Sequence, residues 1–210
     1  FSFYFSHHIT TIEGGMVVTN DEDIYEILKC LRTHGWSREQ KNKEEYEQKY
    51  ANIDSKFLFI NVGYNFRPME IQASMGRIQL GKLISQNENR KQNYREITSK
   101  IQKICEETKK MNLICMNNTD KCDAAWFALP FLLNESINKK EYLKKVEERG
   151  IDTRPVVTGN FARQPAFELF NIDVDPSIYA NAERIHDRGF FIGLPARKLD
   201  NEEIDEIVDI

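Results

Sequence analysis

Several features are absent from this sequence of 210 residues, and each absence excludes a class of protein. No apolar run approaches the roughly 18 residues that a bilayer-crossing helix requires, and no basic stretch with an apolar core opens the chain as a secretion signal would. The formal net charge of −4 mixes both signs along the chain, so no basic tract indicates nucleic acid or an anionic membrane. We therefore expect a cytoplasmic protein whose partners are small molecules or other proteins.

The cysteines and histidines of the sequence are also not spaced as metal ligands usually are. The sequence has four cysteines, at Cys30, Cys105, Cys115 and Cys122. None of them forms a C-x-x-C pair, which zinc knuckles and clustered iron–sulfur sites use. His34 and His186 fall in separate predicted helices and show no His-x-x-x-His spacing. We expect reduced thiols and no metal site.

The first third of the chain predicts short strands, one helix and a long polar excursion. "GGMVVTN" is typical of a buried strand, and Asn20 or Asp21 can cap a helix whose apolar residues recur at helical spacing until Gly35. Residues 37–56 are almost wholly polar, which predicts a mobile loop. "FLFINVGYNFRP" then resembles a strand that leads into a helix at Pro68.

The remainder predicts one long helix and a compact α/β domain. Apolar residues from Ile71 to Ile104 mark one face of a helix of about 35 residues, a length that often bridges two domains. After Lys110, the strands "NLICM", "AAWFALPFLL" and "IDTRPVV" alternate with the helices "KKEYLKKVEERG", "SIYANAERIHDRG" and "NEEIDEIVDI". The chain begins without methionine inside an aromatic run and ends without a helix stop signal, so we expect a fragment.

His7 and His8 are the residues most suited to chemistry near the start of the chain. Imidazole serves as a base or as a metal ligand, but a strand would point adjacent histidines to opposite faces, so at most one would serve a given site without a sharp turn. The alternative is that these histidines lie on the surface, or make their hydrogen bonds within the core, and take no part in catalysis or metal binding. The spacing alone does not choose between these roles.

The residues around the two histidines resemble a known family. The order S-F-x-x-x-basic-x-apolar-T-T-x-E-G-G, from Ser2 to Gly15, is similar to the pyridoxal-phosphate segment of the DegT/DnrJ/EryC1/StrS sugar aminotransferases. "LRTHGW", "GYNFRPMEIQASMGRIQL", "RGIDTRPVVTGNF" and "GFFIGLPARKLDNEEIDEI" resemble later segments of that family in the same order. The resemblance covers nearly the whole chain.

This resemblance implies a fold and a cofactor. The fold is α/β, as the C-terminal part of a fold-type I PLP-dependent transferase: residues 1–80 end the large PLP-binding domain, 81–110 form the connecting helix, and 111–210 form the small α/β domain. Ser2 falls on the cofactor phosphate-binding serine. Asn65 falls on the residue that reaches the cofactor phosphate of the neighbouring subunit, which implies a homodimer with shared active sites; a turn residue is the alternative for Asn65. The residues that contact the cofactor ring lie upstream of Ser2 in the family.

The basic position of the pattern, which is the covalent lysine in most of the family, is His7 in this chain. Imidazole cannot hold the cofactor covalently, but it is a competent base near neutral pH. The substitution resembles the dehydratase branch of the family, which implies an enzyme that uses PLP and pyridoxamine phosphate to remove the C3 hydroxyl of an NDP-4-keto-6-deoxyhexose, with glutamate as amino donor. The usual setting of such enzymes is the synthesis of deoxysugars for surface polysaccharide, including lipopolysaccharide O-antigen. The scattered cysteines do not match the related branch that carries an iron–sulfur cluster.

Five further residues are candidates for binding the nucleotide sugar or glutamate: Arg67, His34, Arg38, Arg154 and Asn160. A guanidinium suits both phosphate and carboxylate groups, although an exposed arginine without a ligand is an equally good interpretation. Trp126 is assigned to the core. Two alternatives to the dehydratase stay open: a nucleotide-sugar aminotransferase of the same family, and a catalytically inactive homologue that acts as a binding subunit.

Overall fold

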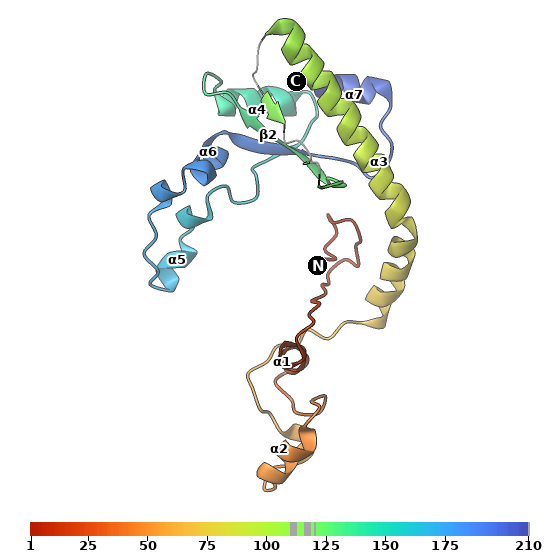
Figure 1. Ribbon diagram of the computed structural model, residues 1–210, viewed down its shortest axis with the longest axis vertical. Helices are drawn as coiled ribbons and strands as arrows, with labels where there is room; N and C mark the ends of the chain where they lie inside the picture. The colour runs from red at the N-terminus through yellow and green to blue at the C-terminus, as the bar shows by residue number, and fades with distance from the viewer. Residues whose placement is uncertain (110–112, 116–118, 120, 210) are drawn as a thin grey trace. The chain divides into compact units, whose positions relative to one another are not determined.

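The structure is a computed structural model of the chain, and it describes all residues except 110–112, 116–118, 120 and 210 (Figure 1). The chain divides into two compact units, Phe1–Lys82 and Leu83–Ile210, which are described one after the other. Among the described residues, no helix combines the length and hydropathy that crossing a membrane would require.

Helices and turns make up most of the first unit. α1 spans Glu22–Arg32, α2 spans Lys43–Lys49, the 3-10 helix η1 spans Ser55–Phe57, and α3, which spans Glu70–Thr108, begins here. α1 starts after Asp21 because a carboxylate oxygen of Asp21 accepts the N–H of Ile24 at 2.9 Å. Of the two predicted caps, Asp21 is the one used.

The strands predicted for the first unit are not formed. Its β pairing consists of three isolated bridges, Ser2–Gly15, Thr33–Asn65 and Trp36–Phe59. Val17 and Val18 of the predicted strand are exposed. β-branched residues form a stable strand only when a neighbouring strand completes the hydrogen bonds, and the described residues offer this segment no such neighbour. The prediction of strands here is therefore wrong.

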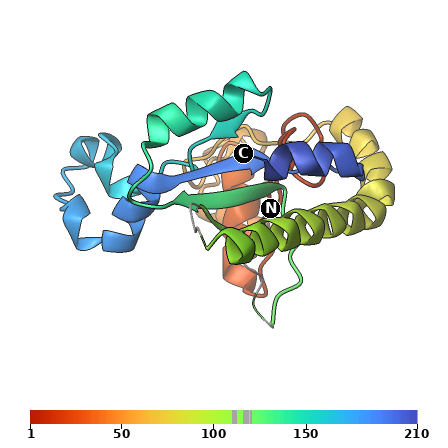
Figure 2. The ribbon, with the colours of Figure 1, turned by 90° about the horizontal axis from the view of Figure 1, so that it is seen from above.

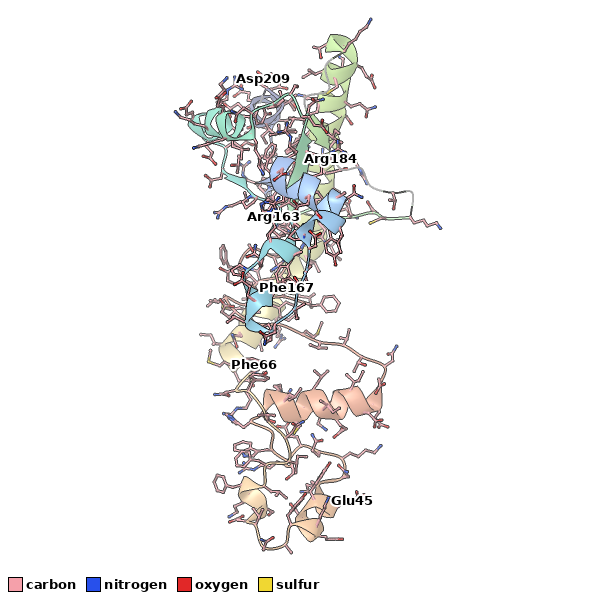
Figure 3. All side chains as sticks on the ribbon, turned by 90° about the vertical axis from the view of Figure 1, so that its left-hand side faces the viewer. Glu45, Phe66, Arg163, Phe167, Arg184 and Asp209 are labelled. Atoms are coloured by element: carbon pink, nitrogen blue, oxygen red, sulfur yellow. The ribbon has the colours of Figure 1, made fainter. Side chains whose placement is uncertain are left out.

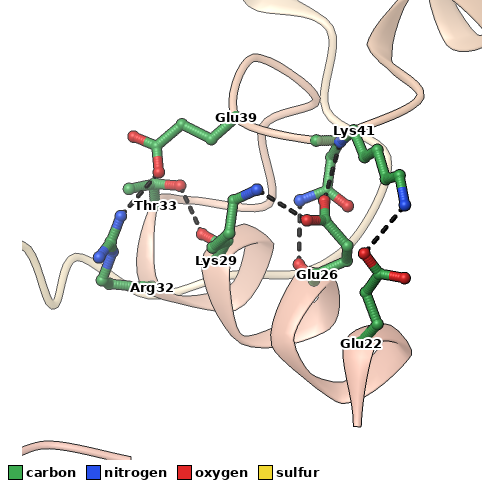
Figure 4. A network of polar contacts seen from close by, with 8 residues as sticks. Glu22, Glu26, Lys29, Arg32, Thr33, Glu39 and Lys41 are labelled. Carbon is green, nitrogen blue, oxygen red and sulfur yellow. Dashed lines mark hydrogen bonds and ion pairs between the residues drawn. The ribbon is translucent and has the colours of Figure 1, made fainter. Parts of the chain in front are cut away.

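The polar excursion at 37–56 is not a simple loop, because it contains α2 and part of it is tied to α1. Glu39 forms an ion pair with Arg32 at 2.6 Å, and Lys41 forms one with Glu22 at 2.9 Å, as Figure 4 shows. The backbone N–H of Lys41 also donates to the carboxylate of Glu26 at 2.8 Å. The charged composition that predicted a loop instead supplies partners for the surface of α1.

A four-stranded antiparallel sheet organises the second unit. β1 spans Leu113–Cys115, β2 Ala128–Leu133, β3 Thr153–Arg154 and β4 Gly189–Gly193, in the order β1-β2-β4-β3. The register places Phe131 opposite Phe190 and Leu129 opposite Ile192, so these four side chains share one face of the sheet.

Some of the helices in this unit cover the apolar face of the sheet. α4 spans Lys139–Glu148, α5 Ala166–Leu169, α6 Ala180–Arg188 and α7 Asn201–Val208, with short 3-10 helices η2 at Phe161–Arg163 and η3 at Pro176–Ile178. Ile97 of α3, Tyr142 of α4 and Ile204 of α7 pack with the strands in one core, and Figures 1 and 2 show the three helices on the same side of the sheet. Trp126 packs at the edge of this core, as the sequence predicts.

Asn93 ties α3 to the segment that leads into α7. Its fully buried amide donates to the carbonyls of Pro195 and Arg197, at 3.3 and 2.8 Å, and accepts the N–H of Leu199 at 3.0 Å. Three backbone groups that would otherwise be unpaired are thus satisfied by one side chain.

The α/β class and the long helix are confirmed, since α3 has 39 residues. The three later helices also lie where the sequence predicts them. The ends of the predicted strand "NLICM", Asn112 and Met116, lie outside the described residues. The assignment of residues 1–80, 81–110 and 111–210 to separate domains stays a prediction.

Candidate functional site

The first sixteen residues form a loop closed by backbone hydrogen bonds. The N–H of Phe3 donates to the carbonyl of Gly14 at 2.9 Å, and the N–H of Thr11 donates to that of Phe3 at 2.9 Å. Gly14 has φ of +151°, and a Cβ there would lie 2.6 Å from Thr11 Oγ1, so a side chain is excluded. Ser2 and His7, which the sequence predicts to act together, are therefore held in one loop.

His7 lies in a turn within this loop, since its N–H donates to the carbonyl of Tyr4 at 3.0 Å. Both His7 and His8 are half-buried. Because the backbone turns here, the strand alternation that would separate the two imidazoles does not apply. In the part of the chain that the structure describes, no group of three or more His, Cys, Asp or Glu side chains is arranged to hold a metal ion.

Two glycines bring the "LRTHGW" and "GYNFRP" segments together. A Cβ on Gly35, which has φ of +84°, would lie 1.8 Å from the carbonyl oxygen of Asn61, and one on Gly63 would lie 2.1 Å from the backbone nitrogen of Gly35. Backbones this close leave no room for side chains. The bridge between Thr33 and Asn65 forms beside this crossing.

Four of the predicted site residues gather near the crossing, around Trp36. The guanidinium carbon of Arg38 lies 4.1 Å from the Trp36 ring centroid, that of Arg67 lies 5.9 Å from it, and the His34 ring lies 5.0 Å from it in an edge-on arrangement. Arg67 Nε donates to Asn65 Oδ1 at 3.2 Å. Because a guanidinium can only donate, this bond leaves the amide nitrogen of Asn65 to donate elsewhere.

The two arginines of the cluster carry positive charges that no ion pair neutralises in the described part of the chain. Among the described residues, neither Arg38 nor Arg67 forms an ion pair, although Arg38 donates to the carbonyl of Lys56. Arginines stack on aromatic rings and bind phosphate or carboxylate groups with paired N–H donors. The arrangement is suited to an anionic ligand that sits against Trp36.

Trp36 is the member of this cluster that sequence reasoning did not select. The indole N–H of Trp36 and the hydroxyl of Ser37 are buried without a hydrogen-bond partner in the described structure. The signal was present, because Trp36 closes the "LRTHGW" segment, but a single tryptophan does not by itself indicate a site.

Arg154 and Asn160 belong to the second unit. Arg154 is exposed at the end of β3, whereas Asn160 is buried and makes its hydrogen bonds within that unit. The predicted binding residues thus divide between two units of the chain.

Comparisons with known proteins give one consistent family. The model of the DegT/DnrJ/EryC1/StrS aminotransferase family matches residues 1–210. GDP-4-keto-6-deoxy-D-mannose 3-dehydratase of Yersinia pseudotuberculosis is 36% identical over 201 residues, which cover 92% of this chain and 48% of that protein. The lipopolysaccharide biosynthesis protein RfbH of Salmonella typhimurium is 30% identical, over 99% of this chain and 48% of its own length.

Solved structures agree with these relatives. The E. coli GDP-4-keto-6-deoxy-D-mannose-3-dehydratase with bound hydrated PLP has a TM-score of 0.79 at 31% identity, over 99% of this chain and 52% of that one. A variant of the dehydratase ColD, in which a serine becomes asparagine and the histidine after it becomes lysine, has a TM-score of 0.80 at 30% identity, over 98% and 53% of the two chains. The same dehydratase with a trapped PLP-glutamate geminal diamine has a TM-score of 0.80 at 30% identity, over 99% and 53% of the two chains. The chain thus spans about half the length of the proteins it matches.

Proposed function

Because the chain belongs to the DegT/DnrJ/EryC1/StrS aminotransferase family, we propose that it is part of a PLP/PMP-dependent NDP-4-keto-6-deoxyhexose 3-dehydratase. The enzyme removes the C3 hydroxyl of a nucleotide-linked 4-keto-6-deoxy sugar and takes its amino group from glutamate. The relatives that support this proposal include dehydratases with that activity in their names and a complex that contains PLP and glutamate.

The observation that carries the proposal is His7. The family holds its cofactor through a lysine, and this chain has a histidine at the matching position. A dehydratase of known structure has been studied as a variant with lysine in place of a histidine that follows a serine, and the present chain has the same dipeptide, Ser6 and His7. A histidine at this position can still transfer protons, but it cannot attach the cofactor covalently.

The residues of the first unit fit a cofactor that carries a phosphate. Ser2 Oγ accepts the N–H of Tyr4 at 3.3 Å, so its own hydrogen is available to donate to a phosphate oxygen. Asn65 has its amide nitrogen available for the same purpose. Ser2 would hold the phosphate from one subunit and Asn65 from its dimer partner, so the homodimer completes each site. When bound, the cofactor supplies an amino group and an electron sink.

His7 acts as the base. An imidazole nitrogen of His7 takes up the proton whose removal permits the C3 hydroxyl to leave, and the resulting imidazolium can return that proton to the departing oxygen. The hydrogen bond from the His7 N–H to the Tyr4 carbonyl fixes the backbone from which the ring projects. The half-buried His7 side chain thus acts first as the base and then as the acid.

The cluster around Trp36 binds the charged part of the substrate. Arg38 and Arg67 provide N–H donors for the diphosphate of the nucleotide sugar or for the carboxylate of glutamate, and Trp36 provides an aromatic surface next to both. His34 lies at the edge of the same ring. We assign the enzyme to the cytoplasm and to deoxysugar synthesis for surface polysaccharide, in line with the role named for RfbH.

The decisive experiment incubates the full-length protein with pyridoxal phosphate, glutamate and GDP-4-keto-6-deoxymannose, and follows 2-oxoglutarate, ammonia and the sugar product by mass spectrometry. Ammonia with a 3-deoxy sugar supports the dehydratase. A 4-amino sugar without ammonia would establish the aminotransferase alternative instead. If cofactor and sugar bind but no product forms, the protein is an inactive binding subunit.

A further inference from the structure

Arg90 of α3 is a buried cation in the second unit, since only 8% of its surface is exposed. Two arginines of this unit that Figure 3 labels show the usual arrangements: Arg184 is exposed, and Arg163 forms an ion pair with Glu183. Arg90 forms no ion pair with any residue that the structure describes. Burial lowers the pKa of Arg90, and a buried charge without a counterion is strongly disfavoured.

One side of the Arg90 guanidinium is held in place and another is left for a ligand. Its Nε donates to the carbonyl of Leu194 at 3.3 Å. The neighbouring Asn89 donates to the carbonyl of Ala196 at 3.0 Å, which keeps this segment against α3. In contrast, Arg90 Nη1 is buried and has no hydrogen-bond partner among the described residues. The guanidinium is therefore oriented before any ligand binds to Nη1.

Asn87 supplies a second polar group on the same face of the helix. Residues three apart lie on one face of a helix, and helix side chains lean towards the N-terminus, so the Arg90 side chain extends over the turn that contains Asn87. Asn87 Oδ1 is also buried without a hydrogen-bond partner in the described structure. A half-turn of this amide about χ2 exchanges Oδ1 for Nδ2, and the two residues then present two N–H donors.

The charge and the donors of this pair fit a carboxylate. Lys91, the next cation on the helix, is already paired with Glu88 and Asp123, at 3.1 and 2.6 Å. Arg90 therefore contributes a single uncompensated charge, which one monoanion neutralises. Two donors match the two oxygens of a carboxylate, whereas a phosphate group carries up to two charges and offers more acceptors than the pair can bind. A water molecule or a neutral amide would leave the charge of Arg90 unpaired.

We propose that Arg90 and Asn87 form a carboxylate-binding site on α3. The carboxylate belongs either to an Asp or Glu side chain of the assembled full-length protein or to a free carboxylic acid anion. The first source is available because the chain spans about half the length of its relatives, 48% in the case of the Yersinia dehydratase. The inference goes beyond the proposed function, since neither residue was assigned to the reaction.

The first measurement looks for a carboxylate of the protein itself. Arg90→Lys in the full-length protein keeps the charge and places an amine at the site, and a carbodiimide joins such an amine to a carboxylate in contact with it as an amide. We expect peptide mapping by mass spectrometry to find a cross-link between position 90 and an Asp or Glu. Asn87→Lys repeats the measurement from the second position if Arg90→Lys does not fold.

Two controls calibrate the cross-linking. Lys100 Nζ lies 2.5 Å from a carboxylate oxygen of Asp205, so this pair should be joined in every sample. Arg77→Lys makes the same change at an exposed position of α3, where the sequence has no Asp or Glu three or four residues away. This variant should give no cross-link at position 77.

The second measurement looks for a free carboxylate. The Tm of the full-length protein is followed in sodium acetate and in sodium chloride of the same ionic strength. A free carboxylate ligand predicts that acetate raises Tm with increasing concentration while chloride does not, because a ligand that binds only the folded state stabilises it. Asn87→Ala and Arg90→Gln should each abolish this rise.

The two measurements together decide the inference. A cross-link at position 90, or a rise in Tm that is specific to acetate, supports it and identifies the source of the carboxylate. Without a cross-link, an equal rise in acetate and chloride shows an adventitious ion only and overturns the inference. The absence of both effects, in samples where Lys100 and Asp205 are joined, overturns it as well. Neither measurement uses the enzymatic reaction, so a failure of the proposed function is seen separately.

Discussion

At the scale of single residues, the proposed function depends on His7, which we assign to the position of the family's covalent lysine. His7→Lys would restore the amine that holds the cofactor covalently and remove the base. We expect dehydration to fall by roughly 10²- to 10⁴-fold, the usual contribution of a general base. The measurement is ammonia release at saturating substrate, with cofactor retention after borohydride reduction and denaturing gel filtration as the second readout.

His7→Asn is the control for this substitution, because it removes the base without adding an amine. It should lose dehydration to the same extent and retain no cofactor after denaturation. Dehydration at the wild-type rate in either variant would contradict the assignment of His7 as the base.

A second prediction at this scale concerns Arg67, whose guanidinium lies near Trp36 and orients Asn65. Arg67→Gln should raise KM for the nucleotide sugar roughly ten- to hundredfold, since a hydrogen bond to a charged group is worth about 1.5–3 kcal/mol. Arg77→Gln makes the same change of charge at an exposed position of α3 and serves as the matched control. Equal KM values for the two variants would remove Arg67 from the site.

At the scale of secondary-structure elements, Asn93 makes the connection between α3 and the segment before α7. Asn93→Ala leaves two carbonyls and one N–H of residues 195–199 without a partner in the core. We expect the free energy of unfolding to drop by about 3 kcal/mol, measured by urea denaturation. Gln102→Ala, on the exposed side of the same helix, should change it by less than about 0.5 kcal/mol. A similar effect of both substitutions would show that the Asn93 bonds contribute little.

The carboxylate of Glu203, at the start of α7, should make the stability of the fold depend on pH. Arg197, followed by the N–H of Asp200, lowers the pKa of Glu203 from 4.5 to about 2. The folded chain therefore binds this proton less tightly than the unfolded chain, so the stabilisation is complete above pH 4.5 and is lost as the pH falls towards 2. We expect Glu203→Gln to reduce the change in the free energy of unfolding between pH 4.5 and about 2. The measurement is the midpoint of urea denaturation at a series of pH values in this interval. An unchanged slope would mean that other carboxylates account for the acid sensitivity.

The sequence predicted elements well where local signals agree with packing. The caps and apolar periodicity of α1, α4 and α7 are local, and each helix lies where it is predicted. The strands predicted in "GGMVVTN" and in the first part of "FLFINVGYNFRP" are not formed, because a strand depends on a neighbour that a sequence window does not contain. The cluster around Trp36 depends on two segments that meet at Gly35 and Gly63. Its arginines and histidine were predicted from their chemistry and their position in the sequence, while the contact of all three with Trp36 was not.

At the scale of the whole molecule, the proposed shared site predicts complementation between subunits. His7→Ala and Asn65→Ala should each be inactive as homodimers. A heterodimer of the two has one site with both natural residues, so equal mixing after subunit exchange should recover about a quarter of wild-type activity. The measurement is ammonia release before and after exchange. No recovery in verified heterodimers would show that His7 and Asn65 serve the same subunit.

The crossing of Gly35 and Gly63 has a consequence for how such a protein can evolve. A Cβ on Gly63 would overlap the backbone of Gly35, and a Cβ on Gly35 would overlap the backbone of Asn61, so neither position accepts a side chain. New substrate preferences must therefore arise by exchange of the side chains around the crossing. A saturation library selected for folded protein should therefore lose every variant at these two positions, while variants of Arg38 and His34 keep the fold and differ in substrate binding.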